Sequence, residues 1–320
     1  MRESARDLLR QYDKKFPLKH AGEIYADTTD IVRIGYGDVI ELAGLHYLVL
    51  RDEIERRFGV EDVKYWVKRC RCLETNQSKI LKLVFHETFP QKFGDAEILC
   101  YRSEQKEARI LDMVRGDARF MQGFSAPDAA GNLVRVLDVI RGKRLDLTVE
   151  DIDADHETYF HDHLPGLLRD WAGACRAIAS LHSRDEKHGD IRRDHLWIDY
   201  KSGGYTWIDF DFTFDCVESP FGLDILGLGN SLVFLAGKAD LTPGVIAETF
   251  GERALDSLCP QDFSLFFRNR LVNLRTIYPY VPQSLNNVLM HFSAASEVFY
   301  ESVDELLGDL MPAVEDIDRA

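Results

Sequence analysis

The spacing of hydrophobic residues changes character along the chain. Near the N-terminus it is helical, because Leu8, Leu9 and Tyr12 fall on one face of a short amphipathic helix that Pro17 ends. The next twenty residues have no regular period and are interrupted by glycines. We therefore expect residues 1–46 to form an N-terminal extension that packs on the domain that follows.

Over residues 47–140 the apolar residues occur in short runs that predict β-strands. The runs are Tyr47–Leu50, Val63–Val67, Ile80–Phe85 and Leu133–Ile140. The third run contains one charged residue, Lys82, which must contact an anion or reach water. Between the third and fourth runs, the pattern predicts a helix from Ala96 to Val114. This part of the chain is therefore expected to be rich in strands.

Residues 141–320 are expected to form a mainly helical domain. Apolar residues recur every three or four positions over residues 164–182 and predict a long helix there. Residues 241–317 are interpreted as further helices with joints at prolines, the last of them Pro312. One hairpin interrupts the helices: Leu196–Ile198 and Tyr205–Ile208 read as strands joined by a turn at residues 201–204.

Composition limits the classes of function. The chain has 320 residues, 45% of them hydrophobic, and a net charge of −15. Such an acidic chain is not expected to bind nucleic acid, because phosphate contacts require a basic surface. The six cysteines form no disulfide or zinc pattern, and neither a signal peptide nor a run of about 20 apolar residues is found. We expect a protein of the cytoplasm without a membrane span.

Polar side chains gather around the predicted hairpin. Asp190 and His195 precede its first strand, and Asp209 and Asp211 end its second. A hairpin brings the entry of one strand beside the exit of the other, so these groups are expected to lie together. Phosphoryl transfer needs a carboxylate that orients a hydroxyl nucleophile and further ligands that hold a divalent cation.

The stretch H-G-D-I-R-R-D-H, followed by I-D-F-D, resembles the catalytic loop and metal-binding loop of the protein-kinase-like phosphotransferases. Aminoglycoside and choline kinases use similar H-G-D and I-D-F segments. His195 stands where most of these enzymes have asparagine, but the lipopolysaccharide-core sugar kinases also resemble this form. Imidazole is a ligand better suited to Mn²⁺ or Zn²⁺ than to Mg²⁺.

Other segments extend the resemblance in the order that the family follows. Lys82 matches the lysine that contacts the α- and β-phosphates, and Glu107 matches its glutamate partner, with Glu104 as second choice. The carbonyl of Asp138 and the amide of Ile140 would face adenine. Asp224 resembles the aspartate that steadies the backbone of the catalytic loop.

The resemblance implies an α+β, two-lobed kinase-like fold and an ATP-dependent transfer to a hydroxyl group. By the same resemblance, Asp190 would orient the acceptor hydroxyl and Arg192 would neutralise the transferred phosphate. Asp209, His195 and Asp211 would hold Mg²⁺ or Mn²⁺. The expected partners are the nucleotide and a hydroxyl-bearing substrate.

The sequence leaves three functions open. Asp224 follows Asp209 by only fifteen positions, which favours a small-molecule or sugar acceptor over a Ser/Thr protein substrate. The usual glycine-rich phosphate loop is missing, because only Gly59 lies between the first two strands, and Arg56 and Arg57 would have to hold phosphates instead. This departure keeps open a kinase-shaped binding module without transfer activity.

Overall fold

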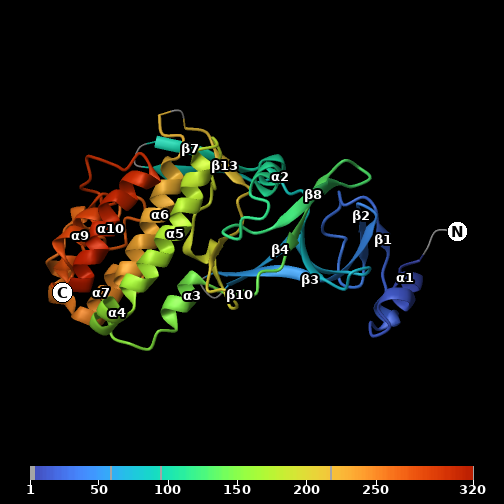
Figure 1. The fold of residues 1–320 in the computed structure, drawn as a ribbon, viewed down its shortest axis with the longest axis horizontal. Coiled ribbons are helices and arrows are strands. Elements are labelled where there is room, and N and C mark those ends of the chain that lie inside the picture. The colour runs from blue at the N-terminus through green and yellow to red at the C-terminus, as the bar shows by residue number, and fades with distance from the viewer. Residues whose placement is uncertain (1–3, 58–59, 94–95, 217, 320) are drawn as a thin grey trace. The chain divides into compact units, whose positions relative to one another are not determined.

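The computed structural model describes residues 4–57, 60–93, 96–216 and 218–319. The chain divides into two compact units. The first unit comprises Met1–Glu87 with Arg102–Ile140, and the second comprises Thr88–Tyr101 with Arg141–Ala320. The first is rich in strands and the second in helices, as the colours of Figure 1 show, so the α+β class predicted from the sequence is confirmed.

A seven-stranded sheet forms the body of the first unit, in the order β1-β2-β3-β4-β5-β9-β8. The strands are β1 (Ile24–Tyr25), β2 (Val39–Leu42), β3 (Leu45–Arg57), β4 (Val60–Cys72), β5 (Ser78–Lys82), β8 (Gly123–Pro127) and β9 (Leu133–Asp138). All neighbours pair antiparallel except β1 and β2. The four predicted strands are present, although β3 and β4 are longer than their apolar runs and β5 ends at Lys82.

Residues 1–46 are not only an extension that packs on this sheet, because β1 and β2, in the stretch for which no regular structure was predicted, are two of its strands. The residues before them pack against it. Helix α1 (Ala5–Tyr12) buries Leu8 and Leu9 against residues of β2 and β3. Tyr12, which the helical pattern placed on the same face, is 41% exposed. The helix ends before Pro17, and the 3₁₀ turn η1 (Leu18–His20) follows it.

The predicted helix from Ala96 to Val114 is wrong in its first half. Residues there form strand β7 (Ala96–Arg102), which pairs with β6 (Thr88–Phe93) and β13 (Phe212–Phe214) within the second unit. Helix α2 (Glu104–Met113) begins only after Ser103, whose hydroxyl caps it by accepting from the Lys106 amide at 3.2 Å. The apolar residues before this cap alternate in exposure, as a strand requires.

The hairpin and the long helix of the second unit agree with the predictions. Helix α5 (Leu164–His182) covers the predicted range, and β11 (Leu196–Asp199) pairs with β12 (Tyr205–Trp207). A third strand, β10 (Gly142–Arg144), extends this sheet on the other side of β11. Asp199 closes the turn by accepting from the amides of Lys201 and Ser202, at 3.0 and 2.8 Å.

Helices make up most of the rest of the second unit. They are α3 (Leu145–Glu150), α4 (His156–Asp162), α6 (Gly222–Gly237), α7 (Pro243–Phe250), α8 (Glu252–Asp256), α9 (Gln283–Met290) and α10 (Val303–Arg319), with 3₁₀ turns η2 (Arg193–His195), η3 (Pro260–Asp262) and η4 (Leu274–Thr276). Pro312 lies inside α10 and not at a joint. In the described ranges, no helix is both long and apolar enough to cross a bilayer.

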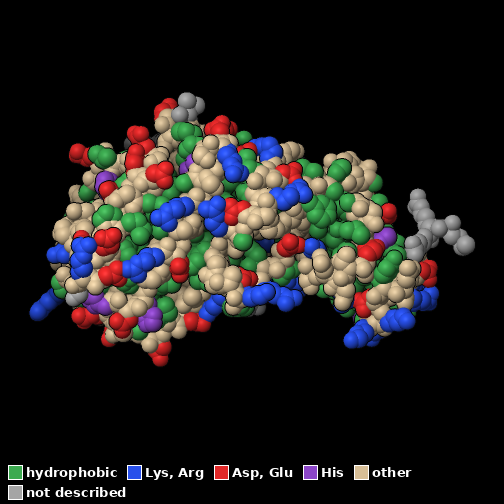
Figure 2. Space-filling model, viewed as in Figure 1, with side chains coloured by type: hydrophobic (Ala, Val, Ile, Leu, Met, Phe, Trp, Pro, Cys, Tyr) green, Lys and Arg blue, Asp and Glu red, His purple; other side chains and the backbone are tan. Residues whose placement is uncertain are grey.

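On the face in Figure 2, basic side chains are interspersed with acidic ones.

Candidate active site

Asp224 organises the loop that carries the candidate catalytic residues. It lies fully buried near the start of α6 and accepts hydrogen bonds from the amides of His188 and Gly189, at 2.7 and 2.8 Å. Nε2 of His182, at the end of α5, lies 3.0 Å from the same carboxylate. Burial raises the pKa of Asp224, but these hydrogen bonds and the nearby histidines outweigh it, and the pKa is lowered overall. The loop contact expected of Asp224 is therefore present.

The carboxylate of Asp190 is held next to this anchored backbone. Its side chain is 22% exposed, so one edge reaches solvent. Burial raises its pKa, the charges of His195 and Arg192 oppose the rise, and those of Asp209 and Asp194 add to it, with a net increase. A carboxylate with a raised pKa is a stronger base than an ordinary aspartate, which suits a group that orients or accepts a hydroxyl proton.

Arg192 is engaged mainly by a neighbour that the motif did not single out. Its Nε donates to Oδ1 of Asp194 at 2.9 Å, its Nη2 contacts Oδ2 of the same carboxylate, and its Nη1 lies 3.7 Å from Oδ2 of Asp190. Burial works to raise the pKa of Asp194, but the bonds from Arg192 overcome it and lower the pKa. Asp194 therefore stays ionised and holds the guanidinium beside Asp190.

The ring of His195 lies between the two motif carboxylates. Its Nδ1 is 2.9 Å from the carbonyl oxygen of Asp190 and 3.5 Å from Oδ2 of that residue. A carbonyl only accepts, so Nδ1 carries a proton and donates it. Nε2 lies 3.5 Å from Oδ2 of Asp209, and a bound cation or a second proton makes that contact favourable. A histidine that donates one ring N–H to a carbonyl is oriented as metal-binding histidines are.

Asp209 has a backbone conformation that side chains other than glycine rarely adopt. Its φ is +66°, in the left-handed region, which costs about 1 kcal/mol or more and is typical of functional sites. This bend turns the chain out of β12 toward β13 and leaves the carboxylate 34% exposed beside His195. Asp211, two residues later, is buried. Carboxylate oxygens with one imidazole nitrogen are a donor set that fits Mg²⁺ or Mn²⁺.

The first unit contains the second cluster of candidate residues. Nζ of Lys82 donates to Oε1 of Glu107 at 2.9 Å, which selects Glu107 over Glu104. Arg135 on β9 donates from Nε to Oε2 of the same carboxylate at 3.0 Å. All three side chains are buried, with at most 5% of each exposed. Sequence reasoning missed Arg135, although a charge inside the apolar run of β9 gave the same signal as Lys82.

The residues expected to face adenine lie where the first unit ends. Asp138 is the last residue of β9, and its exposed carboxylate accepts from Nζ of Lys79 at 2.5 Å. Ile140 is the last residue of the unit. The side chains of Arg56 and Arg57, together with Gly59, lie outside the described part of the structure, so the region of the absent glycine-rich loop has no structural account.

No family model matches the chain, and no curated protein matches it. Among solved structures, the kinase domain of PknI from Mycobacterium tuberculosis, in a cysteine-to-alanine mutant, is similar to the chain with a TM-score of 0.47 and 14% identity. The match covers 85% of this chain and 96% of that one.

Proposed function

We propose that the chain is a protein-kinase-like phosphotransferase that transfers the γ-phosphoryl group of ATP to the hydroxyl of a small molecule. The observation that carries the proposal is the arrangement around His195. Its two ring nitrogens face Asp190 and Asp209, each at 3.5 Å from a carboxylate oxygen, in a loop that Asp224 holds by two backbone amides. This arrangement supplies a base and a cation ligand side by side, as phosphoryl transfer requires.

Asp190 is assigned as the group that orients the acceptor hydroxyl. In the transfer, a bond forms between the acceptor oxygen and the γ-phosphorus while the bond from that phosphorus to the β–γ bridging oxygen breaks, and ADP leaves. The acceptor proton passes to the carboxylate of Asp190, whose raised pKa suits this role. Arg192, held 3.7 Å from Asp190 by Asp194, places positive charge beside the transferred group.

Asp209, His195 and Asp211 are assigned to a divalent cation, Mg²⁺ or Mn²⁺. When bound, such a cation neutralises negative charge on the β- and γ-phosphates. Lys82, paired with Glu107, is assigned to the α- and β-phosphates. The backbone carbonyl of Asp138 and the amide of Ile140 are assigned to adenine.

A small acceptor is favoured by the segment between Asp209 and Asp224. Strand β13 takes up part of this segment, and α6 begins at Gly222. Little chain therefore remains in which to build a docking surface for an extended peptide, as a protein kinase would need.

Calorimetry of ATP binding, with and without Mg²⁺ or Mn²⁺, tests the assignment. We expect the wild type to bind ATP in a metal-dependent way and Asp209→Asn to lose that dependence. Asp215→Asn is the matched control, because Asp215 is an exposed aspartate of the same segment. If ATP binds equally well with and without metal and in both variants, or does not bind at all, the chain would instead be a kinase-shaped binding module.

A further inference from the structure

Helix α6 contacts the catalytic loop at successive points along both segments. Near its start, Asp224 accepts from the amides of His188 and Gly189, at 2.7 and 2.8 Å. Three residues later, a Cβ at Gly227 would lie 2.6 Å from the carbonyl oxygen of Ile191, so the helix backbone approaches the loop more closely there than any side chain allows. The first half of the loop is therefore held against the first half of the helix.

A further contact holds the loop at the other end of the helix. Arg193 donates from Nη1 and Nη2 to the two oxygens of Asp240, at 2.7 and 2.6 Å. Asp240 lies three residues after Gly237, the last residue of α6. The Cζ atom of Arg193 also lies 4.2 Å from the centroid of the Phe234 ring, in the last turn of the helix. A bidentate ion pair that also stacks on a ring fixes the direction of the guanidinium.

The direction of Arg193 is linked to that of the residue before it. Arg192 has extended dihedral angles, φ −144° and ψ 154°, so its side chain and that of Arg193 leave opposite sides of the backbone. The side chain of Arg192 contacts Asp190 and Asp194, whereas that of Arg193 contacts Asp240. Since both side chains leave one short stretch of backbone, rotation of that stretch would break the contact with Asp240 and move Arg192 away from Asp190.

Asp240 also has a longer contact with a second arginine. Nη2 of Arg270 lies 3.3 Å from Oδ2 of Asp240, the oxygen that Arg193 contacts at 2.6 Å. Burial lowers the pKa of Arg270, the charge of Asp240 opposes this shift, and the charge of Arg193 adds to it. The bidentate hydrogen bonds of the carboxylate thus go to the arginine of the loop. Arg270 shares the same carboxylate but lies outside the loop, so it provides a matched control.

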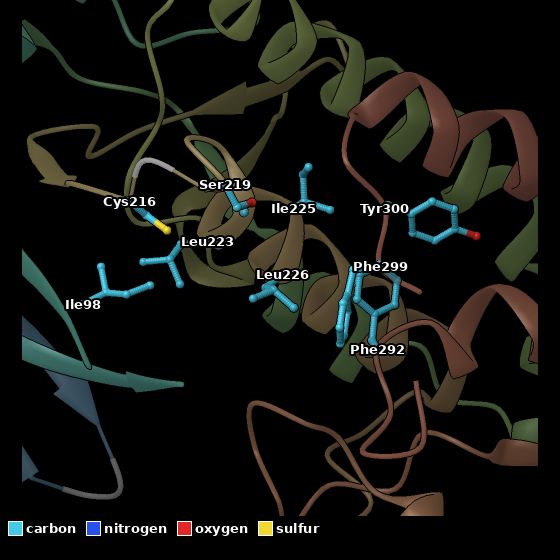
Figure 3. A pocket seen from close by; sticks show the side chains of 10 residues that line it. Ile98, Cys216, Ser219, Leu223, Ile225, Leu226, Phe292, Phe299 and Tyr300 are labelled. Atoms are coloured by element: carbon cyan, nitrogen blue, oxygen red, sulfur yellow. The ribbon is translucent and has the colours of Figure 1, made fainter. Parts of the chain in front are cut away.

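Helix α6 is a fixed support for these contacts. It is buried along most of its length, and a Cβ at Gly229 would lie 2.2 Å from the ring of Phe292. Leu223 and Leu226 of this helix line an apolar cavity of about 170 Å³ (Figure 3). Neither leucine belongs to the loop contacts described above. Leu226→Ala would therefore enlarge the cavity and weaken the packing of α6 without removing a contact that holds the loop.

We propose that Arg193 and Asp240 are a positioning pair, which holds the second half of the catalytic loop as Asp224 holds the first half. The inference rests on the proposed function and deepens it, because the group that the pair positions is Arg192, assigned above to the transferred phosphate. Neither Arg193 nor Asp240 is assigned a contact with ATP or with the acceptor. Their effect on transfer passes through the direction of Arg192 beside Asp190.

Hydrogen exchange of backbone amides, measured by NMR, tests the pair without any activity. The amide of His195 donates to the carbonyl of Arg192 at 3.1 Å, across the residue that the pair holds. We expect Arg193→Gln to speed exchange of this amide by at least about tenfold, the worth of one hydrogen bond to a charged group. The amide of Gly189, which donates to Asp224, should exchange as in the wild type. Unchanged exchange at His195, or equal acceleration at both amides, would overturn the proposal.

Turnover of ATP in Mg²⁺, with water as the acceptor, tests the effect on transfer. We expect Arg193→Gln and Asp240→Asn each to lower kcat about 10- to 100-fold while KM for ATP changes little. The double variant should lose no more than either single variant, because both changes remove the same contact. Arg270→Gln and Leu226→Ala should keep kcat close to that of the wild type. Additive losses, or a loss in Arg270→Gln as large as in Asp240→Asn, would contradict the positioning role.

Two further variants test the route through Arg192. In an Arg192→Gln background, Arg193→Gln should lower kcat no further. The exchanged pair, Arg193→Asp with Asp240→Arg, restores an ion pair of the same total length and should recover part of kcat. A full additional loss in the Arg192→Gln background would overturn this route. If the wild type neither binds nor hydrolyses ATP, the proposed function is wrong, and the amide exchange still decides whether Arg193 holds the loop.

Discussion

Lys82 and Arg135 bind opposite oxygens of one buried carboxylate, that of Glu107. The two cations are direct partners across the pairing of β5 with β9. Arg135 has further donors, which it gives to the carbonyls of Leu133 and Leu83, at 2.8 and 3.3 Å. Helix α2 is therefore attached to the sheet by two buried bridges, one from β5 and one from β9.

This double bridge predicts a ranking of stabilities. Glu107→Gln removes a buried anion that lies between two buried cations and should destabilise the first unit by about 3–5 kcal/mol. Arg135→Met leaves the carboxylate with Lys82 and should cost about 1–3 kcal/mol. Arg115→Met is the control, because that exposed pair with Asp112 is worth less than about 1 kcal/mol. Thermal unfolding measures all three, and a larger loss in Arg135→Met than in Glu107→Gln would contradict the geometry.

Asp224→Asn should slow transfer more than it weakens nucleotide binding. The carboxylate of Asp224 accepts from the backbone N–H groups of His188 and Gly189, one at each oxygen. The asparagine amide has only one oxygen, and its NH₂ would face the other N–H donor. The loop therefore loses one of its two hydrogen bonds. We expect kcat to fall about 100-fold, the scale of a small misplacement of reacting groups, and KM for ATP to change little. Steady-state kinetics decide it, with the exposed Asp256→Asn as control. A rise of about 100-fold in KM for ATP, with kcat unchanged, would show that the contact of Asp224 with the loop does not position Asp190.

His195→Asn should change metal preference. The variant replaces an imidazole nitrogen next to Asp209 by an amide, whose oxygen suits Mg²⁺ better. We expect the ratio of activity with Mn²⁺ to activity with Mg²⁺ to drop by about tenfold, a change that matches typical effects on metal affinity. Activity titrations with each metal test it, and His161→Asn serves as control. An unchanged ratio would remove His195 from the cation site.

His156 should make the second unit sensitive to mild acid. Burial lowers its pKa from 6.5 to about 4, while its hydrogen bond to the Ala236 carbonyl opposes this shift. The fold therefore favours the neutral ring of His156. Its contribution to the free energy of unfolding is complete above pH 6.5 and declines as the pH falls from 6.5 to 4, by at most about 3 kcal/mol. His156→Gln keeps hydrogen-bonding groups but does not titrate. Its unfolding temperature should fall less over this interval than that of the wild type, and parallel curves would contradict the prediction.

Local patterns predicted the elements whose causes are local. The three- and four-residue spacing of α5 and the turn residues at 201–204 act within a few positions, so both elements lie where expected. The prediction for residues 96–102 was wrong, because the spacing of their apolar residues fits a helix as well as a strand. As a strand, β7 pairs with β6, directly before it, and with β13, more than a hundred residues later in the chain.

The candidate active site divides in the same way. The contacts of Asp190, His195 and Asp209 follow from one short hairpin, and a sequence motif can therefore indicate them. Arg135 shares its carboxylate with Lys82 only because β9 lies beside β5, a pairing between segments 53 positions apart at Lys82 and Arg135. A local sequence pattern cannot show that Arg135 lies beside Lys82. A charged residue inside an apolar strand does indicate that its side chain needs a partner.

The hairpin of β6 and β7 has a consequence for how the protein can be divided. The chain enters the second unit at Thr88, returns to the first at Arg102 and leaves it finally after Ile140. Neither unit is thus encoded by one continuous stretch of sequence. A cut after Ile140 would separate β7 from its partner β13 and expose an unpaired strand edge, which favours aggregation. We therefore expect that neither unit can be expressed alone, and that the two units move between proteins only as one piece.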